Sequence, residues 1–171
     1  MSIGRISPVI GGCDPGLDGA FAIIQGDDVL ATLVVPTIQG KSKGRQMDET
    51  LLEQQFRELC VYGPEHFGVE QVSAMPKQGS VSMFKFGECF GFQKGLISGE
   101  RIPRTMVAPI VWKRELGLGS NKEGSLDRAG QLFPKHVKLF RSERGVRNAK
   151  QASGIAEACL IAYYVDHYRL G

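Results

Sequence analysis

The sequence predicts an α/β fold with a five-stranded mixed sheet flanked by helices. Three short apolar runs near the N-terminus, separated by turn residues, are typical of an antiparallel meander. Later segments alternate between helical spacing and short apolar runs, as in strands joined by crossover helices. The 171 residues suffice for one core. We therefore expect a single domain over residues 1–171 that holds the whole function.

The first two predicted strands form a hairpin around residues 14–19. Residues 9–14 are the first strand, Pro15 and Gly16 turn the chain, and residues 19–24 return antiparallel. A third strand is expected over 29–35. Asp14 stands at the mouth of this hairpin, where it is either a turn residue or a functional acid, because Asp before Pro-Gly also suits a turn.

The next segments predict a loop, a helix and a buried strand. Residues 39–46 read as a polar, basic loop, and a helix capped by Asp48 or Thr50 follows with apolar side chains at helical spacing. The run 67–70 then predicts a strand parallel to the first, after a right-handed connection. This arrangement puts Glu70 at the end of a parallel strand.

A helix is predicted over residues 82–98, with an inner side made of Phe84, Cys89, Phe92 and Leu96. Glycines recur at every fourth position, at 87, 91 and 95, which would permit close packing against another helix. Core or dimer packing explains the phenylalanines best, and base stacking is the alternative for Phe84, Phe86 and Phe90.

The last third of the chain predicts one more strand and several helices. Residues 105–108 are the candidate fifth strand, followed by helices from Pro109 and over 122–133, and 134–150 reads as a basic loop. A terminal helix over 153–168 carries Glu157 in an apolar neighbourhood. Burying a carboxylate there is costly unless it is paired or bound to metal.

The net charge of +3 is unevenly placed. Residues 101–150 carry 12 basic and 4 acidic side chains, whereas residues 1–100 carry 8 and 12. The basic stretch is either a solvated face or a surface for a polyanion. The candidate polyanion contacts in this stretch are Arg141, Arg144, Arg147 and Lys150.

Other features exclude some classes of protein. No apolar run approaches the roughly 18 residues that span a bilayer, so no membrane partner is expected. The four cysteines show no CxxC pairing, which favours reduced thiols over a zinc site. The three histidines are scattered and suggest no nucleophilic catalysis.

Asp14, Glu70 and Glu157 could meet where the two parallel strands lie side by side. Clustered carboxylates repel one another unless divalent cations neutralise them, and oxygen ligands suit Mg²⁺ or Mn²⁺. The simplest interpretation is phosphodiester hydrolysis with two ions per site. One ion would lower the pKa of the attacking water, and the other would stabilise the leaving 3′ oxygen.

Four segments, in this order and spacing, resemble motifs of RuvC-type Holliday-junction resolvases. They are 12–16, 69–71, Trp112–Lys113 with Lys122, and 156–162. The later motifs are most similar to the chloroplast and bacteriophage branches. The resemblance implies an RNase H-like fold, a homodimer, and paired symmetric nicking of a four-way DNA junction. It also implies a bacterial or phage-infected cytoplasm or, for a processed plant protein, the chloroplast.

By the same resemblance, Asp14, Glu70 and Glu157 match the metal-binding acids. Lys113 and Lys122 resemble basic residues at the scissile phosphate, with Lys122 counted among the catalytic residues. Lys77, in the loop after Glu70, and Phe84 complete the predicted DNA contacts.

One acid of the resembled motif is missing. The family places a fourth acid one turn before the last one, where this chain has Ser153 and Gly154. We count Ser153 among the site residues, but a serine hydroxyl is a neutral, weak ligand, so the second ion would be poorly held.

Two other classes remain open. A junction-binding protein that no longer cuts would share the fold, and Ser153 is its main support. An RNase H-like nuclease acting on RNA, or a fragment of a sugar-kinase-like ATPase, fits less well, because the kinase needs a second domain that 171 residues cannot supply. The preferred cleavage sequence and the choice between Mg²⁺ and Mn²⁺ also stay open.

Overall fold

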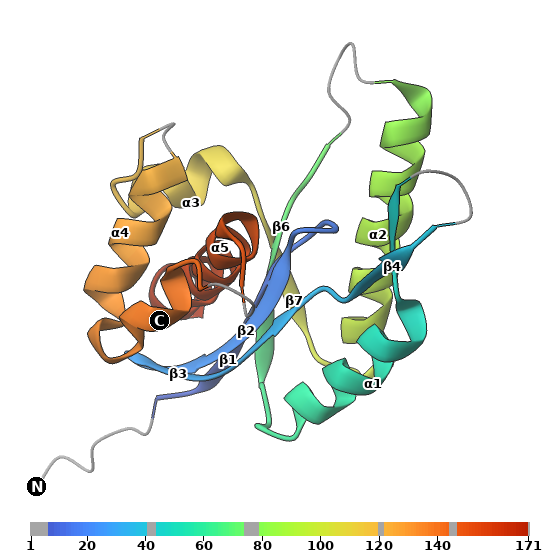
Figure 1. The fold of residues 1–171 in the computed structure, drawn as a ribbon. Coiled ribbons are helices and arrows are strands. Elements are labelled where there is room, and N and C mark those ends of the chain that lie inside the picture. The colour runs from blue at the N-terminus through green and yellow to red at the C-terminus, as the bar shows by residue number, and fades with distance from the viewer. Residues whose placement is uncertain (1–6, 41–43, 74–78, 120–121, 144–146, 171) are drawn as a thin grey trace, which may run out of the picture.

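A computed structural model describes residues 7–40, 44–73, 79–119, 122–143 and 147–170. Its centre is a five-stranded sheet with the order β3-β2-β1-β6-β7, in which β6 and β7 run parallel to β1 and the other pairs are antiparallel (Figure 1). The strands are β1 (Val9–Asp14), β2 (Ala20–Gln25), β3 (Asp28–Val34), β6 (His66–Glu70) and β7 (Arg104–Val107). The predicted fold class is confirmed.

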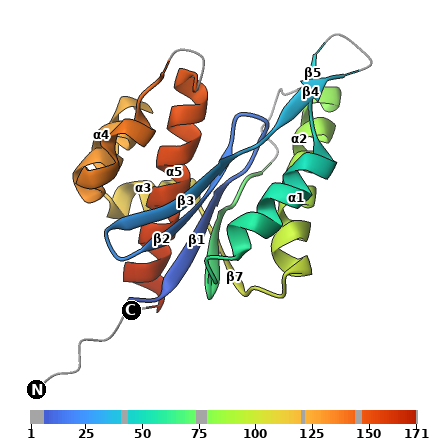
Figure 2. The same ribbon diagram turned by 60° about the horizontal axis from the view of Figure 1, so that its bottom comes forward.

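Helices cover both faces of the sheet (Figures 1 and 2). One face carries α1 (Glu49–Cys60) and α2 (Ser80–Gly99). The other face carries α3 (Pro109–Glu115), α4 (Lys122–Leu132), the 3₁₀ helix η1 (Pro134–Phe140) and α5 (Ala149–Val165), which continues as a short π-helix, η2 (Asp166–Leu170). No described helix is long and apolar enough to cross a membrane.

The alternation of side chains along β2 builds two cores. Ala22 and Ile24 point into the core beneath α5, whereas Phe21 and Ile23 point into the core beneath α1. The ring of Phe21 packs 4.9 Å from that of Phe56, measured between centroids. Because both faces are covered, β2 is almost continuously apolar.

Helix α5 lies unusually close to β1 because Gly12 has no side chain. A Cβ at Gly12 would stand 1.9 Å from the carbonyl oxygen of Ala158, so any larger residue would push the helix off the sheet. This close approach places Glu157, the residue before Ala158, beside the end of β1.

The predicted loop over 39–46 was wrong in part. The structure has a small antiparallel hairpin there, with β4 (Thr37–Gln39) paired to β5 (Arg45–Met47). The hairpin projects beside α2 and is not part of the central sheet, and Met47 is its buried residue (Figure 1). Asp48, one of the two predicted caps, accepts a hydrogen bond from the Leu51 amide and caps α1.

The predicted basic loop over 134–150 also has regular structure. Residues 134–140 form η1, whose Phe140 is buried in the core, and the His136 ring bonds Asp28 Oδ1 at 2.6 Å. Helix α5 begins at Ala149 instead of Ser153, because Asn148 and Gln151 form a capping box.

The prediction that Phe84 lies on the inner side of α2 was wrong. Its side chain is 74% exposed, and the buried positions of α2 are Cys89, Gln93 and Ile97. These three recur every four residues, so the inner side of the helix is rotated from the predicted one.

Candidate active site

Three carboxylates meet at one edge of the sheet. Asp14 ends β1, Glu70 ends β6 and Glu157 lies within α5, and each offers a ligand atom within 4.8 Å of the others. Cys13 pairs with Val69 across the parallel strands, so both chains leave the sheet at the same edge. The predicted meeting of these acids is confirmed, and their catalytic roles stay predictions.

Glu70 is largely buried and is oriented by a tryptophan. Trp112 of α3 donates a hydrogen bond from Nε1 to Glu70 Oε1 at 3.1 Å. Burial raises the pKa of Glu70, the charge of Glu157 raises it further, and Lys113 and the Trp112 bond act in the opposite direction. A negative charge at Glu70 is therefore unfavourable until a cation joins the cluster.

Glu157 has its own set of donors. Lys113 Nζ lies 3.3 Å and 3.4 Å from its two carboxylate oxygens. The buried Ser125 of α4 donates its hydroxyl to Oε1 at 3.2 Å. Residues from α3 and α4 thus hold the Glu157 carboxylate toward the other two acids.

Trp112 and Ser125 were not predicted as site residues. Trp112 stood beside Lys113 in a motif, but its indole donor could not be assigned to Glu70 from the sequence. Ser125 follows Lys122 by three residues on one helix, which is the only sequence signal for it.

Asp14 and Glu157 line a cleft of about 760 Å³ between the 14–19 turn, the first half of α2 and the start of α5. Phe86 lies over Gly16, where an added Cβ would stand 3.5 Å from its ring. Ser153, one turn before Glu157, lines the same cleft, so the structure brings this predicted residue to the site.

Only one of the two positions before Glu157 has room for an acid. A Cβ at Gly154 would lie 2.6 Å from the carbonyl oxygen of Asp18, so the helix touches the 14–19 turn there. Ser153 faces the cleft instead. Residue 153 is therefore the position at which a fourth carboxylate could be accommodated.

Gln93 is a fully buried polar residue beside the turn that carries Asp14. Its Nε2 donates to the Gly16 carbonyl oxygen at 3.3 Å, and its Oε1 accepts from Cys13 Sγ at 3.7 Å. A buried amide is tolerated only when such bonds are made, so Gln93 ties α2 to the turn. The sequence offered no signal for it, since glutamine is ordinarily an exposed residue.

The predicted DNA contacts are distributed unevenly. Lys113 lies at the carboxylates, and Lys150 pairs with Asp18 at 3.6 Å. Phe84 is exposed on α2. Outside the described residues fall Lys77, Arg144 and the side chain of Lys122.

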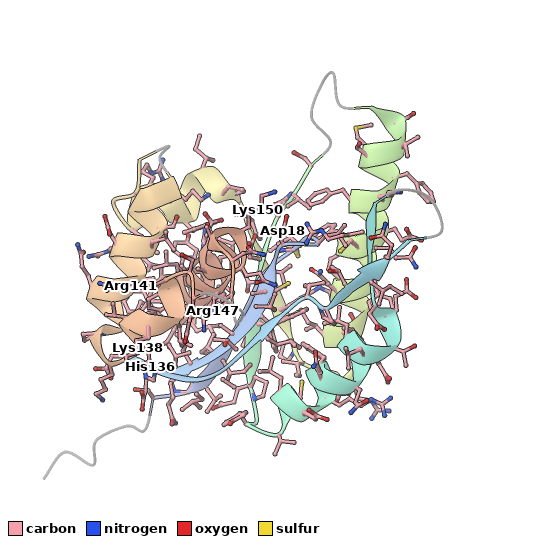
Figure 3. All side chains as sticks on the ribbon, viewed as in Figure 1. Asp18, His136, Lys138, Arg141, Arg147 and Lys150 are labelled. Carbon is pink, nitrogen blue, oxygen red and sulfur yellow. The ribbon has the colours of Figure 1, made fainter. Side chains whose placement is uncertain are left out.

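Two of the predicted contacts lie near η1. Arg141 is exposed, whereas Arg147 donates from Nη1 to the carbonyl oxygens of Lys138 and Arg141, both at 3.0 Å. Figure 3 shows these side chains around η1, apart from Lys150 and Asp18 beside the turn after β1. Arg147 therefore has a structural role in addition to its predicted one.

The ligand atoms of the cluster suit a hard divalent cation. All three groups offer carboxylate oxygens, and no described histidine or cysteine belongs to the cluster. Mg²⁺ and Mn²⁺ prefer such ligands. The four cysteines are free thiols, as predicted, with Cys13, Cys89 and Cys159 buried and Cys60 partly exposed.

The fold is shared with RuvC and related Holliday junction resolvases. Thermus thermophilus RuvC in complex with a Holliday junction substrate superposes with a TM-score of 0.65 at 19% identity over 96% of each chain. A second T. thermophilus RuvC structure gives 0.54 at 16% identity, over 92% of this chain and 95% of the other. Ydc2, the yeast mitochondrial Holliday junction resolvase, gives 0.59 at 15% identity, over 98% and 85%.

No protein-family model matches the sequence, and neither does any curated protein sequence. The likeness to solved structures therefore establishes the fold, which agrees with the expected RNase H-like architecture. The predicted placement in the chloroplast and bacteriophage branch stays a prediction.

Proposed function

We propose that this chain is a Holliday junction resolvase, an endonuclease that resolves four-way DNA junctions by paired symmetric nicks. The observation that carries the proposal is the cluster of Asp14, Glu70 and Glu157, with ligand atoms within 4.8 Å. The cluster stands on a fold that is shared, over 96% of both chains, with a RuvC bound to junction DNA.

The activity would depend on Mg²⁺ or Mn²⁺, with two ions per site. Asp14 would hold both ions, Glu70 would support one, and Glu157 with residue 153 would support the other. Bound there, divalent cations supply an activated water and stabilise the leaving 3′ oxygen. The oxygen-only ligand set and the raised pKa of Glu70 support this part of the proposal.

The chain's own side chains orient the acids and the DNA. Trp112 fixes the rotamer of Glu70, and Ser125 and Lys113 fix that of Glu157. The Lys113 side chain is 31% exposed beside these acids, so it can also reach a phosphate oxygen at the site. Lys122 is proposed to act at the same phosphate by its resemblance alone.

Ser153 sets the strength of the activity in this proposal. The hydroxyl removes one negative charge from the cage of the second ion, so cleavage would be slow while junction binding survives. The serine at position 153 also favours a second candidate function, a junction-binding protein that does not cut. The two candidates differ only in the measured rate of nicking.

A homodimer completes the proposal, because symmetric nicks need two sites. The outer side of α2 offers a surface for a second copy: Val81 and Phe84 are 68% and 74% exposed. Within the described part of the chain, and apart from the neighbouring backbone of α2 itself and the adjacent residues, no atom lies within 4 Å of a Cβ placed at Gly87, Gly91 or Gly95. This flat stripe of glycines beside exposed apolar side chains suits close contact with the same helix of a partner.

A cleavage assay tests the function. Four-way, Y-shaped and linear DNA of equal length are incubated with the protein and Mg²⁺, and Asp14→Asn serves as the control that lacks the shared metal ligand. We expect paired nicks in the four-way junction only, abolished by EDTA and by Asp14→Asn. Equal cutting of linear duplex would contradict the proposal.

Binding measured in EDTA, together with cleavage measured in Mg²⁺ and in Mn²⁺, separates the two candidates. A protein that binds the four-way junction selectively, but leaves it intact with both Mg²⁺ and Mn²⁺, is the non-cleaving binder. Affinity should fall steeply with salt, since phosphate contacts release counterions. Equal affinity for junction and linear duplex would reject both candidates.

A further inference from the structure

Two cations from different elements of the fold meet at one carboxylate. Arg45 of β5 donates from Nη2 to Asp18 Oδ1 at 2.7 Å, and Lys150 of α5 lies 3.6 Å from Asp18 Oδ2. Asp18 belongs to the turn after β1, which lies between α5 and the β4–β5 hairpin in both ribbon views. Each carboxylate oxygen of Asp18 is thus paired with a cation from a different element.

These ion pairs contribute little to the stability of the fold. The side chains of Arg45, Lys150 and Asp18 are 45%, 73% and 31% exposed. Exposed pairs of this kind stabilise proteins very little, because water and salt screen them. A stronger anion can therefore replace Asp18 without disturbing the structure.

Arg45, Lys150 and Asp18 lie where nucleic acid would leave the carboxylate cluster. Asp18 and Lys150 line the cleft that contains Asp14 and Glu157, and Arg45 lines the adjoining cleft beneath the hairpin. Lys85 of α2 lines both clefts. Figure 3 shows Lys150 and Asp18 side by side at this edge.

The spacing along α5 suits one DNA strand. Lys150 precedes Glu157 by seven residues, which is two turns, or about 10 Å, of the same helix face. Successive nucleotides of one duplex strand rise about 3.4 Å, so a phosphate at Lys150 would lie within about three nucleotides of one at Glu157.

We propose that Arg45 and Lys150 form a second phosphate-binding site at the mouth of the cleft, which Asp18 fills with its own carboxylate in the free protein. The ligand is a backbone phosphate of the DNA strand that enters the catalytic cleft, so this inference rests on the proposed function. A guanidinium and an ammonium together match a phosphate better than a carboxylate, because the phosphate offers more acceptor oxygens. Asp18 then sets the affinity by competing with the DNA.

The test measures binding of the full-length protein, in EDTA, to a four-way junction and to linear duplex over a range of salt. We expect Arg45→Gln and Lys150→Gln each to weaken binding about three- to tenfold and to reduce the salt slope by about one. Asp18→Asn should strengthen binding by a similar factor, and this gain should vanish in the Arg45→Gln/Lys150→Gln background.

The control variants come from α1, where Arg57 and Glu53 form an exposed ion pair at 2.5 Å and line neither cleft. Arg57→Gln and Glu53→Gln make the same changes of charge at a distant surface. If Asp18→Asn weakens binding, or strengthens it no more than Glu53→Gln does, Asp18 does not compete with DNA for the two cations, and the proposal is overturned.

The design separates this inference from the proposed function. Equal affinity of the unmodified protein for junction and duplex would reject the junction function, whereas the order of the Asp18, Arg45 and Lys150 variants can be compared on either DNA. A thermal unfolding curve for each variant checks that the fold is intact.

Discussion

Glu70 and Glu157 are each only 9% exposed, although they approach each other at the same edge of the sheet. Donors from α3 and α4 compensate part of this cost: Trp112 for Glu70, and Lys113 with Ser125 for Glu157. The remaining repulsion is what a bound cation would remove. A divalent cation bound at this cluster would therefore stabilise the fold.

Glu70→Gln should stabilise the metal-free protein, because it removes one of two facing charges while a side-chain oxygen can still accept from Trp112. We expect the melting temperature in EDTA to rise by about 2–4 °C, the change that about 1 kcal/mol causes in a chain of this size. The increase that Mg²⁺ produces in the unmodified protein should be reduced in the variant. Differential scanning calorimetry with and without Mg²⁺ measures both effects, and a lower melting temperature of the variant in EDTA would contradict the argument.

Ser153→Asp should raise the rate of nicking, because it restores a carboxylate one turn before Glu157 in the cage of the second ion. We expect single-turnover cleavage of a four-way junction to accelerate by about tenfold or more, with a lower Mg²⁺ requirement. Ser153→Asn is the matched control, since it adds similar bulk without charge. Full activity of the serine form, with no gain from aspartate, would show that water or Glu157 already completes the coordination.

At the scale of elements, the parallel strands β6 and β7 are joined by a histidine as well as by their backbones. His66 Nε2 lies 2.9 Å from Thr105 Oγ1, and partial burial lowers the pKa of His66. The bond links the start of β6 to the edge strand. Since Glu70 ends β6, the stability of the β6–β7 pairing affects the geometry of the site.

The lowered pKa of His66 predicts a loss of stability in acid. Between its folded and unfolded pKa values the unfolded chain binds more protons, so the free energy of unfolding decreases as pH falls below about 6.5. His66→Gln keeps a partner for Thr105 and should flatten this dependence. Urea unfolding from pH 7.5 to 5 measures it, and an equally steep decrease in the variant would assign the effect to other groups.

At the scale of the whole molecule, the face of α2 that points away from the sheet is the proposed contact between two copies. Exposed apolar side chains and open glycines stand on this face, and α2 also lines the carboxylate cleft through Ser82, Lys85 and Phe86. A partner bound along α2 would therefore stand close to the DNA path of both copies.

Gly91→Lys should abolish dimerisation while preserving the monomer. The added side chain enters open space within the described chain, and lysine is a better helix former than glycine, so the monomer should be no less stable. Analytical ultracentrifugation at micromolar concentration should give a dimer for the unmodified protein and a monomer for the variant. Gly99→Lys, at the other end of the exposed side of α2, is the control. An unmodified protein that is monomeric with and without junction DNA would overturn this prediction.

Local patterns in the sequence were sufficient to predict the central sheet and the meeting of the three acids. The apolar run over residues 20–24, the turn at Pro15 and Gly16, and the short run before Glu70 each encode local structure within a few residues. The right-handed crossover rule then places the first and fourth of the predicted strands in parallel. Asp14 and Glu70 consequently had to leave the sheet at one edge.

Such local patterns did not predict the polar or irregular segments. The strands of the β4–β5 hairpin have only three residues each, too few for a recognisable alternation. The helix η1 is held by distant partners, with His136 bound to Asp28 and Phe140 buried in the core. The exposure of Phe84 depended on the rotation of α2, which Cys89, Gln93 and Ile97 set by packing against the sheet. None of these contacts is local in the chain.

Only the tertiary structure determines which side chains orient the acids. The hydrogen bonds from Trp112 to Glu70 and from Ser125 to Glu157 span 42 and 32 residues. The choice of Ser153 over Gly154 as the position open to a fourth acid depends on the Asp18 carbonyl against α5. Residue types specify what a side chain can donate or accept, but only the packing of α3, α4 and α5 on the sheet determines which groups stand within hydrogen-bond distance.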